Sequence, residues 1–261
     1  MFASIESGAG FPAKGLILTT QVSTTVLTGL LFALDFLNMR FRVPFREPVN
    51  GMTHLVGAVL SVVGLIVLLV IAVENGSARK IVAFSIFGAS LVSMYCASAF
   101  YHSLRVSARA VAHLRRIDHM MIYILIAGSY TPICLVLLRG RLGMGLLIAV
   151  WSFAALGVIQ TVAWMHAPQW LSTALYIGMG WLAVFIIRPL LAVAPPGFFL
   201  WLLAGGVIYT LGAVVHATKW PRATTGARPR LFGSHEIWHL CVMGGSFAHY
   251  WAMLFYVARA A

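Results

Sequence analysis

The sequence contains few charged residues and very few acidic ones. Of its 261 residues, 9% are charged, 61% are hydrophobic and only six are Asp or Glu. The mean hydropathy is +0.93. Ordinary soluble domains are about 25% charged, and a soluble fold of this length could not cover so much apolar surface with polar groups. The composition therefore excludes a water-soluble enzyme and a disordered chain, and it indicates an integral membrane protein.

Cysteine is scarce as well. The three cysteines, Cys96, Cys134 and Cys241, are odd in number and lie inside apolar runs. This pattern is typical of packing residues and excludes a disulfide framework or a thiolate metal site.

Basic residues are in excess, with 18 Lys and Arg and a net charge of +12. In a soluble protein this excess would suggest a nucleic-acid partner. Here most basic residues lie in short stretches between apolar runs, where they set membrane orientation. We therefore expect no nucleic-acid partner and expect membrane lipids as partners.

Seven apolar runs near 20 residues in length predict transmembrane helices, because a bilayer core about 30 Å thick needs a helix of that length. We expect the fifth to end at Arg188-Pro189, since proline stops helices. The sequence thus predicts an all-α integral membrane protein, a seven-transmembrane-helix bundle. The runs cover residues 51–73, 81–101, 119–138, 142–164, 171–187, 197–215 and 237–257.

The basic residues are divided unequally between the two ends of these runs. If the run at 51–73 begins in the cytoplasm, eleven Lys and Arg residues lie in inner stretches and six in outer ones. The positive-inside rule then places the start of the first core helix in the cytoplasm and the C-terminus outside.

The first 46 residues differ from the rest. The run 15–37 has the length of an eighth span, but polar residues dilute it. Both an extra span and an amphipathic or poorly ordered extension fit this pattern. We divide the chain into an N-terminal extension, residues 1–46, and a seven-helix membrane domain, residues 47–261.

Ionisable residues in membrane helices are energetically expensive and mark functional sites. Glu47, Asp118 and Glu236 each stand at the start of an apolar helix. In the predicted orientation these starts lie at the cytoplasmic face, so we expect the rare polar side chains of four helices to converge there. The histidines at the same depth are His102, His119, His235 and His239.

The segment Ser234-His235-Glu236-Ile237-Trp238-His239 carries two histidines four residues apart. On a helix they share one face and can bind one metal ion; two hydrogen-bonded histidines near an interface are the simpler alternative. His102 and Asp118 at the same depth favour the metal. Zinc is the expected ion, because imidazole and carboxylate ligands suit it and three protein ligands leave a position for water.

The pattern His-Glu-x-x-His is also typical of zinc proteases that use the glutamate as base. No acidic residue follows Glu236, and the third histidine of the longer protease pattern would fall at Gly245. A third ligand must come from upstream, so we do not favour a protease.

Two further groups of polar residues lie upstream. Ser98 precedes His102 by four residues and shares its helical face. Glu47, Asn50 and His54 form a stripe at i, i+3 and i+7. Helix capping and interhelical hydrogen bonding are the alternative interpretation of that stripe.

Four motifs resemble the hemolysin III family, which belongs with the progestin and adipoQ receptors and, more remotely, the alkaline ceramidases. The resemblance covers residues 47–257, nearly the whole predicted bundle. The motifs are Glu47-Pro-Val-Asn50 with His54, Ser98-x-x-x-His102, Arg115-Arg116-Ile117-Asp118-His119 followed by Ala-Gly-Ser-Tyr-Thr-Pro, and Ser234-His235-Glu-Ile-Trp-His239.

The resemblance implies a seven-helix bundle with zinc near the cytoplasmic side. It implies His102, His235 and His239 as the zinc ligands, Asp118 as the residue that holds the zinc-bound water, and Ser98 as a polar neighbour. Glu236 falls at a position that the family pattern does not fix. Residues expected around the ligands are Glu47, Asn50, His54, His119 and Glu236.

Two functions follow as hypotheses. The first is zinc-dependent hydrolysis of an amide or ester in a lipid; ceramide-like amides are suggested by the wider superfamily alone. The second is a non-enzymatic receptor-like or membrane-perturbing, cytolytic protein with a structural zinc. Either protein would be a multi-pass protein of the cell membrane, in a bacterium the inner membrane. The sequence predicts no particular protein partner.

Overall fold

The computed structural model describes residues 45–164, 166–221 and 233–260. These residues form helices and no strands. Their order is α2 (Pro48–Glu74), α3 (Ala78–Ser103), α4 (Ala108–Pro132) continued by η1 (Ile133–Leu137), α5 (Arg141–Ala163), α6 (Gln169–Gly180), η2 (Trp181–Ile186), α7 (Ile187–Val193), α8 (Pro196–Thr218), and α9 (Ser234–Ala252) continued by η3 (Met253–Val257). The predicted N-terminal extension, residues 1–46, lies almost wholly outside the described residues.

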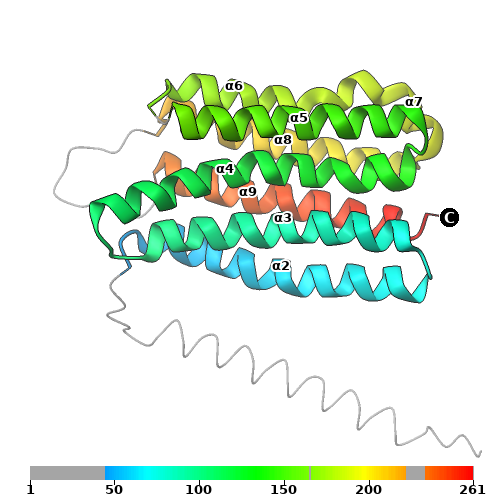
Figure 1. The fold of residues 1–261 in the computed structure, drawn as a ribbon, viewed down its shortest axis with the longest axis horizontal. Helices are drawn as coiled ribbons and strands as arrows, with labels where there is room; N and C mark the ends of the chain where they lie inside the picture. The colour runs from blue at the N-terminus through cyan, green and yellow to red at the C-terminus, as the bar shows by residue number, and fades with distance from the viewer. Residues whose placement is uncertain (1–44, 165, 222–232, 261) are drawn as a thin grey trace, which may run out of the picture. The chain divides into compact units, whose positions relative to one another are not determined.

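Seven of the described helical segments are long and apolar enough to cross a membrane. They run side by side, and consecutive segments alternate in direction (Figure 1). The predicted seven-helix membrane bundle is therefore confirmed. The side of the membrane at which it begins stays a prediction.

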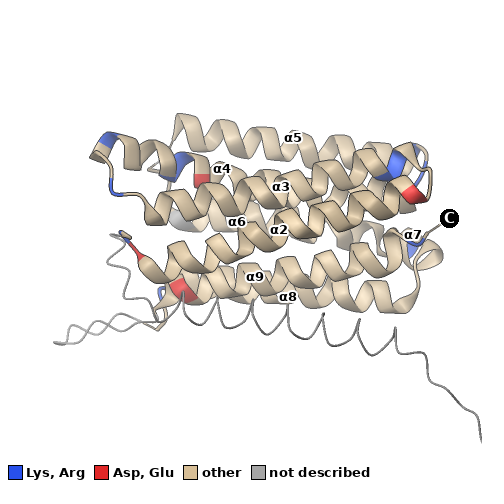
Figure 2. Cartoon of the chain, turned by 90° about the horizontal axis from the view of Figure 1, so that it is seen from below, with Lys and Arg blue, Asp and Glu red and all other residues tan. Residues whose placement is uncertain are grey.

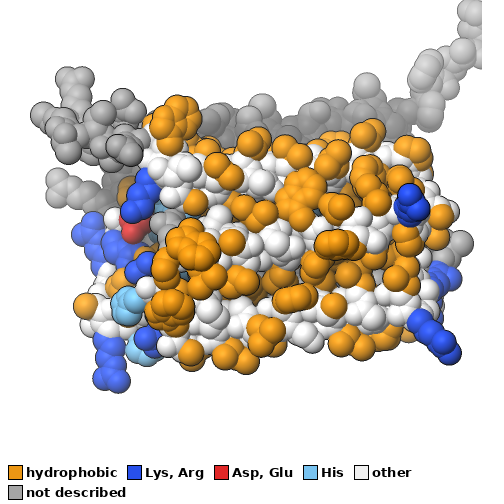
Figure 3. All heavy atoms as spheres, turned by 90° about the horizontal axis from the view of Figure 1, so that it is seen from above, with side chains coloured by type: hydrophobic (Ala, Val, Ile, Leu, Met, Phe, Trp, Pro, Cys, Tyr) orange, Lys and Arg blue, Asp and Glu red, His pale blue; other side chains and the backbone are white. Residues whose placement is uncertain are grey.

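The surface of the bundle suits a bilayer. Apolar side chains cover the middle of the face seen in Figure 3, and Lys and Arg lie at its two ends. In Figure 2 the charged residues likewise lie toward the two ends of the helices. Phe185 is 85% exposed and Ile148 is 61% exposed, which is the arrangement expected of side chains that face lipid.

The third span begins earlier than predicted. The hydropathy pattern placed its start at His119, with Asp118 as a starting residue. In the structure α4 begins at Ala108, and the Ser107 hydroxyl accepts a hydrogen bond from the backbone of Ala110. Hydropathy detects only the apolar part of a helix, whereas Arg and Ala continue a helix well in water. Asp118 consequently lies ten residues inside the helix.

The fifth span also differs from the prediction. It was expected to end at Arg188-Pro189, but α7 continues to Val193. Pro189 is the third residue of α7, where its missing N–H would have no partner within the helix. The preceding segment, η2, is a 3₁₀-helix between α6 and α7. The proline is thus accommodated by a restart of the helix.

Close packing of α2 against α3 supports the end of the bundle that carries the histidines. A Cβ atom at Gly57 would lie 2.6 Å from the Tyr95 ring. Only glycine allows the two helices to approach in this way. Tyr95 in turn meets the ring of His54 edge-on, with centroids 5.1 Å apart.

Candidate metal centre

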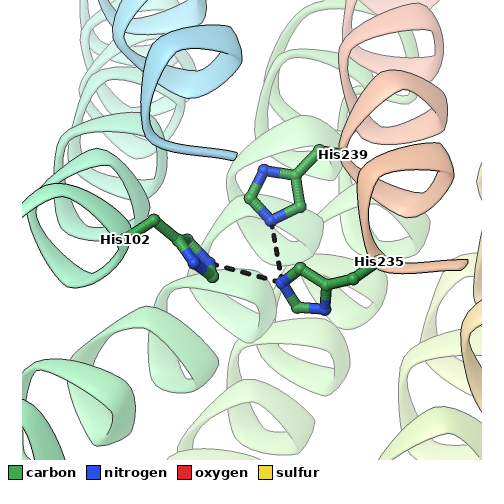
Figure 4. A group of neighbouring side chains, drawn as sticks. All are labelled: His102, His235 and His239. Carbon is green, nitrogen blue, oxygen red and sulfur yellow. Dashed lines mark hydrogen bonds between the residues drawn. The ribbon is translucent and has the colours of Figure 1, made fainter. Parts of the chain in front are cut away.

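Three histidines from two helices meet at one end of the bundle. His102 lies in the last turn of α3, and His235 and His239 lie one turn apart at the start of α9. Their rings point toward one another (Figure 4). The Nε2 atom of His235 is 3.4 Å from Nε2 of His102 and 3.2 Å from Nε2 of His239. The structure therefore brings together the three predicted ligands.

The three nitrogens fit a tetrahedral ion. Two nitrogens at about 2.0–2.1 Å from zinc, separated by a tetrahedral angle, are about 3.3–3.4 Å apart. The two Nε2–Nε2 distances, 3.4 and 3.2 Å, are close to that spacing, and the candidate ligand atoms of all three residues lie within 4.8 Å of one another. In the part of the chain that the structure describes, no other three histidine, cysteine or acidic side chains bring their ligand atoms this close together.

Glu47 orients His102, one of the three candidate ligands. Nδ1 of His102 donates a hydrogen bond to Oε2 of Glu47 over 2.7 Å. Because a carboxylate only accepts, the proton is fixed on Nδ1 and the lone pair of Nε2 faces the other two histidines. The hydrogen bond from His102, together with attraction to it, outweighs partial burial and lowers the pKa of Glu47 to about 2. Carboxylate partners of this kind are usual behind metal-bound histidines.

The lone pair on Nε2 of His102 favours a cation between the three rings. The Nε2 of His235 can donate one proton only, although two imidazole nitrogens lie within 3.4 Å of it. Three neutral rings therefore cannot satisfy both contacts fully. A divalent ion among the three nitrogens would accept all three lone pairs at once.

Asn50 of α2 links α9 to Glu47, the hydrogen-bond partner of His102 on α3. Its side-chain nitrogen donates to Oε2 of Glu47 over 3.2 Å and to Oε1 of Glu236 over 3.0 Å. Oε2 of Glu236 accepts the backbone N–H of Gly233, which precedes α9. Glu236 thus caps the helix of His235 and His239 and is not part of the three-histidine group.

His54 forms one wall of the centre. Its ring stacks on that of His239, with centroids 3.7 Å apart and an interplanar angle of 24°. His54 is only 3% exposed, and neither ring nitrogen has a side-chain hydrogen-bond partner among the described residues. The stack fixes the plane of the His239 ring.

Asp118, Ser98 and His119 line a cavity that begins at the histidines. Ser98 is fully buried, and Asp118 is not part of the three-histidine group. Nδ1 of His119 donates to the backbone oxygen of Arg115 over 2.8 Å. The predicted neighbours therefore lie beside the centre, and their roles stay predictions.

His216 was not singled out in the sequence. It lies in the last turn of α8, and its ring centroid is 5.0 Å from that of His235. It also lines the cavity. The only signal in the sequence was its position directly after the apolar run 197–215, three residues before Lys219.

The cavity extends from the centre into the membrane-spanning part of the bundle. Its volume is about 480 Å³. Asp118 and Ile133 both line it and stand 15 residues apart on one continuous helix, which corresponds to about 22 Å. Most of its wall is apolar, with side chains such as Ile122, Ile126 and Val242. The fold and the site together define the class of protein. It is a seven-helix membrane protein in which a candidate metal centre of three histidines opens into a long apolar cavity.

Comparison with known proteins identifies the family. Residues 43–250 match the protein family described as "Haemolysin-III related". The chain is 37% identical to the Hemolysin-3 homolog of Bacillus subtilis (strain 168) over 214 residues, 82% of this chain and 95% of the relative. It is 38% identical to Hemolysin-3 of Bacillus cereus over 216 residues, 83% and 94% of the two chains. This protein belongs to the hemolysin III family, as the four motifs predict.

A more distant relative supports the wider grouping. The chain is 30% identical to Progestin and adipoQ receptor-like protein 1 of Caenorhabditis elegans over 185 residues, which are 66% of this chain and 43% of that protein. The predicted relationship to the progestin and adipoQ receptors is confirmed.

Proposed function

We propose that this protein is a zinc-dependent hydrolase of amides or esters in lipids. The observation that carries the proposal is the position of the three-histidine group at the end of an apolar cavity about 22 Å long inside a membrane bundle. A lipid chain could lie in such a cavity while its polar end reaches the histidines.

The residues of the centre have distinct roles in this proposal. His102, His235 and His239 would hold zinc and leave one coordination position open, as in catalytic zinc sites. When bound, zinc lowers the pKa of a coordinated water to about 7 and polarises a carbonyl oxygen.

Asp118 would accept the proton of the attacking water and pass it to the leaving amine or alcohol. Its side chain lines the cavity and is 13% exposed, which supports access from the substrate side. The Ser98 hydroxyl lines the same wall and supplies a hydrogen-bond donor for the polar end of the lipid.

The greater number of basic residues at the histidine end of the bundle supports a position of the centre at the cytoplasmic face. The proposed setting is the cell membrane, in a bacterium the inner membrane, with membrane lipids as substrate and surroundings. No protein partner enters the proposal.

A structural zinc in a receptor-like or membrane-perturbing protein is the second candidate. The observation that favours it is the linkage of α2, α3 and α9 at the centre: His54 from α2, His102 from α3 and His239 from α9 are all buried against one another. An ion held by His102, His235 and His239 would connect α3 and α9, and α2 packs against this pair through His54. The two Bacillus relatives carry the name hemolysin, which a cytolytic activity of this chain would match.

Metal analysis combined with a lipid assay separates the two. Purified wild type, His239→Ala and Asp118→Asn would be analysed for zinc, then incubated with ceramides and with ester lipids while released fatty acid is measured by mass spectrometry. The hydrolase proposal expects about one zinc per chain in wild type and Asp118→Asn, turnover in wild type only, and neither in His239→Ala. Zinc that stabilises the fold without turnover of any lipid would support the structural role, and a wild type free of zinc would refute both.

A further inference from the structure

A basic groove lies at the opposite end of the bundle from the histidines. It forms where α3 begins and where η1 turns into α5, and its volume is about 640 Å³. The side chains of Arg79, Arg139 and Arg141 line it. Arg79 and His102 are 23 residues apart on α3, which corresponds to about 35 Å. The groove is therefore separate from the candidate metal centre.

Arginine is concentrated in this groove. The sequence assigns six basic residues to this end of the bundle, and three of them line the groove. No acidic residue is among its lining residues. Arg79 and Arg141 are exposed and make no ion pair with any other residue in the described ranges. Guanidinium groups in this arrangement suit the oxygens of a phosphate.

The arginines lie next to an apolar strip on α5. Met144 is 49% exposed and Ile148 is 61% exposed, and both line the groove one helical turn apart. Gly145 lies between them, and a Cβ atom there would have no neighbour within 4 Å. The groove thus continues from a cationic rim along α5 over surface that suits a hydrocarbon chain.

The start of α5 adds to the positive potential of the rim. Its N-cap residue, Gly140, provides no side-chain hydrogen bond, so the first N–H groups of a 23-residue helix are left for other acceptors. The positive end of the helix dipole lies at the same place as Arg141. The helix end thus adds to the positive potential that the three arginines already provide beside the apolar strip.

We propose that this groove binds an anionic phospholipid, with the phosphate on Arg79, Arg139 and Arg141 and one acyl chain over Met144 and Ile148. A soluble phosphate would use the arginines alone, whereas a zwitterionic lipid would bring its own cation to them. The continuity of the cationic and apolar surfaces matches one molecule that carries both a net negative headgroup and a chain.

The test measures the affinity of the full-length, delipidated protein in detergent for three probes. The probes are dioleoylphosphatidylglycerol, dioleoylphosphatidylcholine and sn-glycerol 3-phosphate. Binding of each is measured by native mass spectrometry and by the shift of the thermal unfolding midpoint. We expect wild type to prefer the phosphatidylglycerol, and the triple variant R79Q/R139Q/R141Q to lose on the order of a hundredfold in that affinity. Arg188→Gln, at the same end but outside the groove, is the matched control and should bind like wild type.

A second pair of variants keeps every arginine. Gly145→Phe fills the apolar part of the groove, while Gly178→Phe places the same side chain at an open position of α6. We expect Gly145→Phe to weaken phosphatidylglycerol binding about tenfold, the scale of one displaced side-chain-sized contact, and Gly178→Phe to leave it unchanged. This pair decides the question if the triple variant does not fold.

Three results would overturn the proposal. One is equal affinity for phosphatidylglycerol and phosphatidylcholine. Another is binding of glycerol 3-phosphate as tight as that of the lipid, which would indicate a site for a soluble anion. The third is an affinity of Gly145→Phe equal to that of Gly178→Phe, because the acyl chain would then lie elsewhere.

Discussion

The side-chain amide of Asn50 lies between two carboxylates, 3.2 Å from Glu47 and 3.0 Å from Glu236. Each carboxylate serves a different part of the candidate metal centre. Glu47 accepts from His102, and Glu236 caps the helix that carries the other two histidines. The amide nitrogen has two protons and can satisfy both acceptors, so it holds together two like charges that would otherwise repel.

The first prediction is that Asn50→Asp weakens zinc binding. A third carboxylate would replace the donor that joins Glu47 and Glu236, and α9 would lose its connection to the hydrogen-bond partner of His102. Partners behind metal ligands typically contribute about 10–100-fold in affinity, and we expect a loss of that size. Competition with a chromogenic chelator measures it.

The matched control is Asn75→Asp, at the other end of α2. Asn75 donates to the backbone oxygen of Ala258 and lies far from the histidines. If both variants bound zinc as wild type does, Asn50 would have no part in holding the centre.

The second prediction is that Glu47→Gln lowers zinc affinity about 10–100-fold, as expected for the partner of a ligating histidine. Glutamine still accepts a hydrogen bond, but it lacks the charge that makes the His102 ring a stronger ligand. Glu74→Gln, at the exposed end of the same helix, is the control and should have no effect. Chelator competition again gives the result, and equal affinities for the two variants would contradict the role of Glu47.

The third prediction separates packing from hydrogen bonding at His54. Emptying a buried side-chain site costs about 2–5 kcal/mol, so His54→Ala should unfold at a lower temperature than wild type. His54→Phe restores a flat ring against His239 and should recover most of that stability. Thermal unfolding of both variants in detergent tests this. A phenylalanine variant no more stable than the alanine variant would show that the ring nitrogens of His54 matter, not only its shape.

The sequence predicted the spans and the pair His235 and His239 because their signals are local, whereas His102 was predicted as the third ligand through the resemblance to the hemolysin III family. A run of apolar residues is sufficient to identify a span, and the four-residue spacing of His235 and His239 places them on one face of α9. The starts of helices were less accessible: α4 begins eleven residues before His119, because Ser107 caps a polar segment that hydropathy does not register.

The contacts between helices could not be predicted in the same way. Asn50 and Glu236 are 186 positions apart, and their hydrogen bond depends on how α2 and α9 pack. The nearness of His216 to His235 likewise depends on the packing of α8 against α9. Motifs identified most residues of the site but not His216, and only the structure shows which of them touch.

The fourth prediction concerns the packing of α2 on α3. Gly57→Ala would place a methyl group 2.6 Å from the Tyr95 ring, and overpacking of this kind costs about 1–3 kcal/mol. Gly178→Ala adds the same methyl group where no atom lies within 4 Å, and it should be neutral or slightly stabilising because alanine favours the helix. We expect the unfolding midpoint in detergent to fall for the first variant alone. Equal midpoints would mean that the two helices can separate at no cost.

The fifth prediction distinguishes the proposed base from the zinc ligands. Asp118 lines the cavity beside the three-histidine group without being part of it. Asp118→Asn should therefore retain zinc and the wild-type unfolding midpoint, while losing about 10²–10⁴-fold in the rate of lipid hydrolysis, the usual contribution of a general base. His239→Ala should lose zinc and hydrolysis together. Single-turnover release of fatty acid, measured on samples of known zinc content, tests both variants. Loss of zinc from Asp118→Asn would instead make Asp118 a fourth ligand, and a centre closed by four protein ligands is typical of a structural zinc site.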